Sequence, residues 1–139
     1  MTHAPSSTHA HLDPRLLGLV FLGGTVGTAL RAVVGLVVPP IAGVPWATVA
    51  INTLGAFALG LLLAALVRHP DHGRGRTMRL LIGTGLLGGF TTYSALAVDT
   101  AGLLGHGRVL EGVAYGLGTL VAGLLGAWSG LLLGTARRG

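Results

Sequence analysis

The residues with the greatest chemical potential lie in an apolar segment, residues 80–98, that carries no charge. Its centre, residues 88–94, reads Gly-Gly-Phe-Thr-Thr-Tyr-Ser. Glycine is a poor helix former, and threonine and serine hydroxyls compete for the backbone groups of a helix. Irregular backbone at membrane depth persists only where it is buried in protein or lines a watery cavity. The segment therefore predicts a transmembrane helix that is broken in mid-membrane, and the break is a candidate ion site.

Polar side chains within the other apolar segments form a second group of candidates, because such residues are costly in a membrane and tend to be functional. Arg31 is the only charge that lies away from the ends of a predicted span. It is expected either to reach the nearer interface or to attract anions into an aqueous vestibule. Asn52 either joins helices or donates its amide N–H groups to an anion. Tyr115 and Thr119 lie one helical turn apart and either line a pore or bond to local carbonyls.

Several reactive groups are missing from the sequence. Cysteine is absent, so neither disulfides nor thiolate chemistry contributes. Asp99 and Glu111 lie near predicted span ends, which argues against a proton-coupled carrier or a small multidrug exporter, because such a carrier needs a titratable relay inside the membrane. The sequence holds no nucleophile–base pair, metal cluster or phosphate loop, so we expect no enzyme. Hydrogen-bond donors, one arginine and a broken helix suit a passive anion pathway.

Composition places the chain in a lipid bilayer. Of its 139 residues, 51% are hydrophobic and 9% are charged, and the mean hydropathy is +0.76. Four apolar segments are long enough to cross a bilayer, and they predict spans at about residues 16–38, 46–67, 78–100 and 110–134. We therefore predict an all-α integral membrane protein with four transmembrane helices per subunit. Residues 1–14 are expected to form a mobile polar tail, and residues 15–139 a single four-helix transmembrane channel domain.

The charges report orientation. All nine basic residues are arginines, and seven fall on the side of the tail, the second loop and the C-terminus: Arg15, Arg68, Arg74, Arg76, Arg79, Arg137 and Arg138. Only Arg108 falls in a loop on the other side. By the positive-inside rule, we expect both termini to lie in the cytoplasm. We expect the membrane to be the plasma (inner) membrane of a prokaryote. The arginines present no basic face, so we expect no nucleic-acid partner.

Glycine is abundant, at 25 residues, and recurs at helical spacing. Gly23, Gly27 and Gly35 share one face of the first span with Arg31, and the fourth span carries a similar row: Gly126, Gly130 and Gly134. Small residues at every fourth position let transmembrane helices approach closely. We expect most of these glycines to serve packing alone.

Three motifs together resemble the Fluc/CrcB family of fluoride channels. They are Gly-Gly-x-x-Gly-x-x-x-Arg at residues 23–31, Asn-x-x-Gly-x-x-x-x-Gly at residues 52–60, and the segment at residues 88–94. The third motif is specific, whereas the first two are weak alone. The resemblance implies an antiparallel homodimer of four-helix subunits, with two fluoride pathways and a structural Na⁺ at the dimer centre. It implies that the backbone carbonyls of Gly88 and Thr91 bind this Na⁺. The implied fluoride pathway comprises Arg31, Asn52, Tyr93, Ser94, Tyr115 and Thr119.

The chain departs from the family pattern at two positions. Leu96 stands where the family has a second phenylalanine, and Gly123 stands where it has a second hydroxyl of the fourth helix. The resemblance implies a fluoride-specific channel subunit that lowers cytoplasmic fluoride by passive export. These departures and the strong arginine bias leave an alternative, a non-conducting or half-conducting subunit of a heterodimeric channel. The antiparallel partner is then a homologous sister subunit instead of a second copy of this chain.

Overall fold

The computed structural model of the chain describes residues 13–67, 69 and 71–136. The predicted tail, apart from Asp13 and Pro14, lies outside these residues, as do Arg68, Arg137 and Arg138. The described chain is helical, and four of its helices are long and apolar enough to cross a membrane. The predicted all-α, four-helix membrane architecture is therefore confirmed.

The four spans follow in chain order. The first is α1, Pro14–Val37, and the second is α2, Trp46–Leu66. The third runs from Gly73 to Gly105 and consists of α3 (Gly73–Met78), the π-helix η2 (Arg79–Leu87), α4 (Gly88–Phe90) and α5 (Tyr93–Gly105). The fourth is α6, Val109–Ala136. The third span is longer than its apolar centre predicts, because the helix continues through polar residues at both ends.

Local sequence explains where the helices start and stop. The Asp13 carboxylate accepts from the Arg15 N–H at 2.9 Å, and Pro14 occupies the first turn, where a missing donor costs nothing. The proline pair at residues 39–40 follows the end of α1, and Pro45 immediately precedes α2. Gly107 turns the chain between α5 and α6 with a φ of 76°, which glycine adopts without strain.

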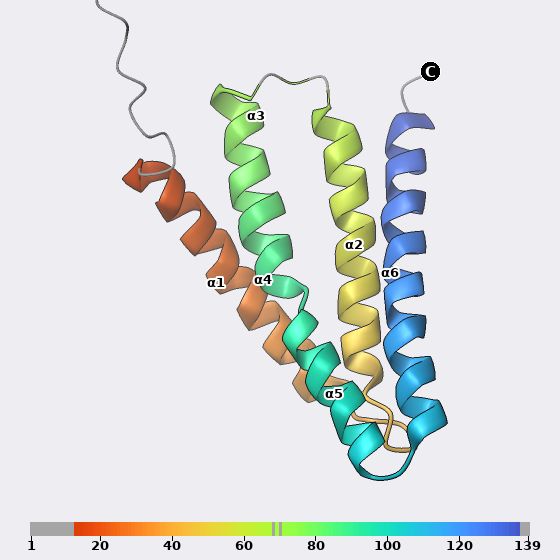
Figure 1. Cartoon of the computed structure of the whole chain (residues 1–139). Coiled ribbons are helices and arrows are strands. Elements are labelled where there is room, and N and C mark those ends of the chain that lie inside the picture. Colours follow the sequence, from red (N-terminus) through yellow and green to blue (C-terminus); the bar gives the residue numbers. More distant parts are fainter. Residues whose placement is uncertain (1–12, 68, 70, 137–139) are drawn as a thin grey trace, which may run out of the picture.

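The helices run up and down through one bundle. The top of Figure 1 holds the start of α1, the end of α2, the start of α3 and the end of α6. The connections from α1 to α2 and from α5 to α6 lie at the bottom. Arg15, Arg74, Arg76 and Arg79 therefore lie at the opposite end of the bundle from Arg108. Within the described residues, the arrangement keeps the charge asymmetry on which the orientation prediction depends.

One arginine ties the loops at each end. At the end where α3 begins, the Arg79 guanidinium donates to the Leu66 carbonyl at 2.8 Å and to Asp71 at 2.9 Å. At the other end, Arg108 donates to the Ala42 carbonyl at 2.9 Å and pairs with Glu111. Hydrogen bonds from a charged donor to loop carbonyls satisfy groups that the helices leave free. These two arginines fix the connections as well as adding to the charge count.

The bundle consists of two close-packed pairs of helices. One is α2 with α6, and the other is α1 with η2 and α4; contacts between the two pairs are fewer (Figure 1). Glycines make both approaches possible. Gly130 faces the backbone of Phe57, and Gly60 faces the backbone of Ala127, so neither position has room for a Cβ. Gly27 lies in the same way against the Leu86 carbonyl. The packing prediction is thus confirmed for these rows, although Gly35 borders open space.

Replacing Gly130 with alanine tests this packing. The added Cβ collides with the Phe57 carbonyl, which belongs to the helix backbone and has little freedom to move. We expect the substitution to lower stability by about 1–3 kcal/mol, as overpacking does elsewhere. Gly118→Ala on the same helix is the matched control, because nothing lies within 4 Å of its added Cβ. Thermal unfolding in detergent measures both; equal midpoints for the two variants would contradict the close approach.

Candidate functional site

The third span is interrupted at two residues between α4 and α5. Thr91 has φ −72° and ψ 157°, and Thr92 has φ −152° and ψ 120°, so both are extended. Their hydroxyls stabilise the interruption. Thr92 is the N-cap of α5, accepting from the Ala95 N–H at 3.1 Å, and the Thr91 hydroxyl donates to the Leu87 carbonyl at 2.9 Å. The depth of this interruption in a bilayer stays a prediction.

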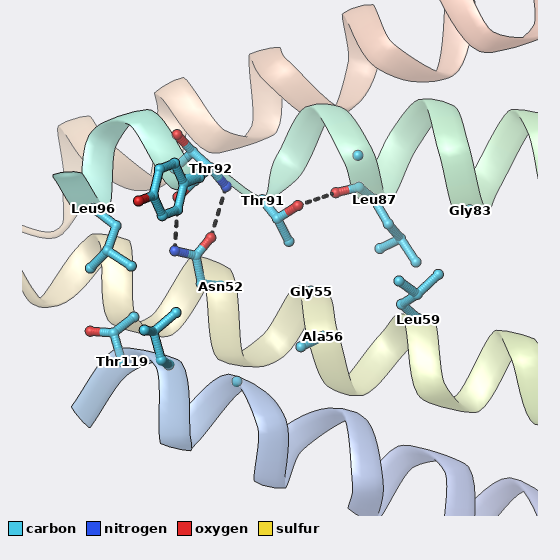
Figure 2. A pocket seen from close by; sticks show the side chains of 14 residues that line it. Asn52, Gly55, Ala56, Leu59, Gly83, Leu87, Thr91, Thr92, Leu96 and Thr119 are labelled. Atoms are coloured by element: carbon cyan, nitrogen blue, oxygen red, sulfur yellow. Dashed lines mark hydrogen bonds between the residues drawn. The ribbon is translucent and has the colours of Figure 1, made fainter. Parts of the chain in front are cut away.

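Asn52 reaches across from α2 and holds the interruption. Its amide nitrogen donates to the Thr92 carbonyl at 2.9 Å, and its oxygen accepts from the Thr92 N–H at 2.8 Å (Figure 2). This is the helix-joining arrangement that the sequence left open for Asn52. The amide nitrogen carries a second N–H that this pair of bonds does not use. The pathway role of Asn52 therefore stays a prediction beside an observed structural one.

Arg31 contacts the same segment from α1. Its Nε donates to the Gly89 carbonyl at 3.2 Å, and the Thr28 hydroxyl lies 3.4 Å from the same oxygen. The Arg31 side chain is partly buried. The Arg31 side chain therefore faces the third helix. This agrees with a position that faces protein, and it disagrees with a side chain that only extends toward the membrane–water interface. A positive charge lies beside the interruption as a result.

A cavity of about 550 Å³ lies beside the interruption, between α2, the third span and α6. Several of the predicted site residues line it together: Asn52, Gly88, Thr91, Tyr93 and Thr119. The two departures from the family pattern, Leu96 and Gly123, line it as well. Figure 2 shows that Asn52, Thr91, Thr92 and Thr119 bring polar atoms to a wall that is mostly apolar. Polar groups gathered in an apolar cavity are typical of a ligand site.

The remaining predicted residues lie around this cavity without lining it. The Ser94 hydroxyl is 3.2 Å from the Thr92 hydroxyl, so it extends the polar edge of the interruption. Arg31 lies on the α1 side. Tyr115 is buried between α5 and α6, one turn before Thr119, and the Thr119 hydroxyl donates to the Tyr115 carbonyl at 2.7 Å. Thr119 thus forms the local bond that the sequence left as an alternative to a pore-lining role.

Tyr93 differs from the other cavity residues in its exposure. Its side chain is 78% exposed on the isolated chain, although it also lines the cavity edge. An aromatic ring that projects from the protein in a membrane contacts either lipid or another subunit. The ring of Tyr93 therefore lies at an outward-facing edge of the cavity.

The structure also brings together a polar cluster that sequence reasoning missed. The Thr48 hydroxyl donates to Asp99 Oδ2 at 2.7 Å, and the Tyr115 hydroxyl donates to the same oxygen at 2.9 Å. The charge pattern places Asp99 near a span end, yet α5 continues for six residues beyond it, to Gly105. One signal was available, since Thr48 precedes Asn52 by four residues and so shares its helix face.

Comparisons with known proteins identify the family. Residues 18–131 match the family described as CrcB-like protein, Camphor Resistance (CrcB). The chain is 48% identical to the fluoride-specific ion channel FluC 2 of Leifsonia xyli subsp. xyli, over 96% of this chain and 95% of that protein. It is 55% identical to FluC 1 of Cutibacterium acnes, over 83% and 82%, and 41% identical to FluC of Thermus thermophilus, over 85% and 94%.

These relatives are named as ion channels and not as enzymes. The predicted resemblance is confirmed, and the spanning helices agree with it. The chain is a multi-pass membrane protein that belongs to the CrcB-like family.

Proposed function

We propose that the chain is a subunit of a fluoride-specific ion channel that lowers cytoplasmic fluoride by passive export. The observation that carries the proposal is the cavity beside the interrupted third helix, where Asn52, Thr119 and Tyr93 meet. The names of the relatives supply the ion. Coupled transport is not needed, because a fluoride gradient directed outward drives export by itself.

A small, strongly hydrated anion that leaves water loses the hydrogen bonds that water molecules donate to it. The cavity offers donors that can replace them. The unused N–H of Asn52 is such a donor, and the hydroxyl of Thr119 becomes one when it turns away from the Tyr115 carbonyl. The ring edge of Tyr93 carries partial positive charge and therefore also attracts an anion. Arg31, held beside the interruption, lowers the cost of bringing a negative charge into a dry region.

We also assign a structural Na⁺ to the interruption, bound by the carbonyls of Gly88 and Thr91. Sodium, like other hard cations, prefers oxygen ligands, and carbonyls freed from a helix provide them. Two observations support the fit. Thr91 is extended, so its carbonyl leaves the helical direction, and Gly88 is exposed on the isolated chain, where ligands from a second subunit can complete the site. Once bound, the cation supplies positive charge near the fluoride pathway.

We infer that the subunit functions as one half of an antiparallel dimer in the plasma membrane, with both its termini in the cytoplasm. The exposed ring of Tyr93 and the exposed Gly88 on the isolated chain support a second subunit at this surface. The end of the bundle that carries Arg15, Arg74 and Arg76 supports one orientation. The oppositely oriented partner is either a second copy or a homologous sister subunit.

Leu96 and Gly123 favour a second candidate, a non-conducting or half-conducting partner subunit. Both line the cavity, where Leu96 presents a buried aliphatic side chain and Gly123 leaves open space. Neither supplies a donor or a polarised ring edge to an anion. In this form the sister subunit carries the groups that this chain lacks.

Fluoride efflux from liposomes that contain the purified chain tests the main proposal. We expect efflux that follows the fluoride gradient, and a loss of at least about tenfold for Asn52→Asp. The carboxylate has no N–H to donate, and a hydrogen bond to a charged group contributes about 1.5–3 kcal/mol. Leu54→Ala is the control on the same helix, because Leu54 is exposed on the far side from the cavity-lining residues. Unchanged efflux in Asn52→Asp would remove Asn52 from the pathway.

The double substitution Leu96→Phe and Gly123→Ser distinguishes the two candidates. If this chain is half-conducting, restoring a ring edge and a hydroxyl to the cavity raises efflux about twofold, since a second pathway opens. The open space at Gly123 accommodates serine, and Gly123→Ala with Leu96→Met is the control that changes both side chains without adding a donor or a ring edge. No rise above wild type would reject the half-conducting form. Robust efflux from the unmodified chain alone would reject an obligate heterodimer.

Orientation is measured with single cysteines, because the chain has none of its own. Val109→Cys and Thr135→Cys place exposed thiols at the two ends of α6. We expect a membrane-impermeant maleimide applied to intact cells to label position 109 and to label position 135 only after the membrane is opened. Partial labelling of both positions in intact cells would show dual insertion and contradict a single orientation.

A further inference from the structure

At the interruption, side chains from two neighbouring helices bind different backbone groups of the third span. In a continuous α-helix the Thr92 N–H would donate to the Gly88 carbonyl. Here the Thr91 N–H still donates to the Leu87 carbonyl at 3.0 Å, but the Thr92 N–H donates to Asn52 Oδ1 at 2.8 Å. Helical bonding thus stops at Gly88. The Asn52 side chain accepts the Thr92 N–H, which the Gly88 carbonyl would accept in a continuous helix.

The same bond also fixes the Thr91 carbonyl. The Thr91 C=O and the Thr92 N–H belong to one planar peptide unit, and that unit is trans, so they point in opposite directions. A side chain that holds the N–H on one side therefore orients the C=O toward the other. Asn52 holds Thr92 at a second point, through its carbonyl at 2.9 Å. Two bonds to one residue leave the peptide unit little freedom to rotate.

Two carbonyls lie between those of Gly88 and Thr91, and the first of them, that of Gly89, is occupied from the other side. Gly89 accepts from Arg31 Nε at 3.2 Å, so its oxygen is directed toward α1. Gly88 and Thr91 both border the cavity, whereas Gly89 does not. Asn52 on one side thus leaves the Gly88 and Thr91 carbonyls available, whereas Arg31 on the other side occupies the Gly89 carbonyl.

We propose that Asn52 is a positioning residue for sodium. It frees the Gly88 carbonyl by binding the Thr92 N–H, and it orients the Thr91 carbonyl through the shared peptide unit. This inference rests on the sodium site of the proposed function and adds to it the side chain that holds the two ligands in place. Asn52 acts on the cation through the backbone and does not touch it. This role is independent of any donation from its second N–H to fluoride.

Thermal unfolding of the purified chain, in NaCl and in N-methylglucamine chloride at equal ionic strength, tests the proposal without measuring efflux. A cation that binds only the folded state raises the midpoint with its concentration. We expect wild type to show a sodium-dependent rise. In Asn52→Leu the Na⁺ concentration that gives half the rise should increase by roughly 10–100-fold, the usual effect of removing a group that orients metal ligands.

Matched variants separate positioning from general destabilisation. Gly60→Ala lowers the midpoint in both salts through its clash with Ala127, yet it leaves the interruption untouched, so its sodium-dependent rise should match wild type. Asn52→Asp keeps an oxygen that accepts the Thr92 N–H, so it should keep more of the sodium response than Asn52→Leu while losing efflux. Asn52→Ala removes both bonds with less bulk and replaces Asn52→Leu if that variant does not fold.

The outcomes separate the inference from the function on which it rests. A folded Asn52→Leu or Asn52→Ala with the wild-type sodium response overturns the positioning role and leaves the sodium site standing. A wild-type chain with no sodium response overturns the sodium site and the positioning role together. Fluoride efflux from that same chain would still support the channel.

Discussion

The need to satisfy backbone polar groups away from water governs this structure. A spanning helix normally bonds all of its own peptide groups, and an interruption frees several of them at once. The chain meets that requirement with side chains from three directions. Asn52 on α2 binds both backbone groups of Thr92, Arg31 on α1 binds the Gly89 carbonyl, and the threonine hydroxyls bind locally. The interruption is therefore a defined conformation and not a loose connection. A selective ion site requires such a defined conformation.

Close helix packing gives those side chains their reach. Asn52 is a short side chain, and it contacts Thr92 because α2 and the third span lie near each other around Gly55, whose missing Cβ leaves room for the Thr91 side chain. Arg31 is positioned in a comparable way, since Gly27 lets the backbone of α1 approach Leu86 and Phe90. In a membrane such contact depends on shape and hydrogen bonds, because lipid chains are as apolar as the helices. The glycines of the motifs thus serve the site indirectly.

Much of this arrangement follows from the sequence, for physical reasons that also set its limits. Apolar run length and proline positions predict the four spans, because both depend only on local chemistry. Residues 88–94 predict an irregular helix for the same reason. The contact between Asn52 and Thr92 joins positions 40 residues apart and depends on how two helices are rotated. The Thr48–Asp99–Tyr115 cluster depends on three helices at once, so no single helical period reveals it.

The pairing of helices has a consequence for biosynthesis. The two close-packed pairs are interleaved along the chain, because α1 packs on the third span and α2 packs on α6, while α1 and α2 share little contact. Each of the first two helices leaves the ribosome before its main packing partner has been made. Both must wait in the bilayer as separate helices, stabilised by lipid and not by each other. The α1 pair can form once the third span is inserted, but α2 gains its main partner only with α6, so the fourth span completes the bundle.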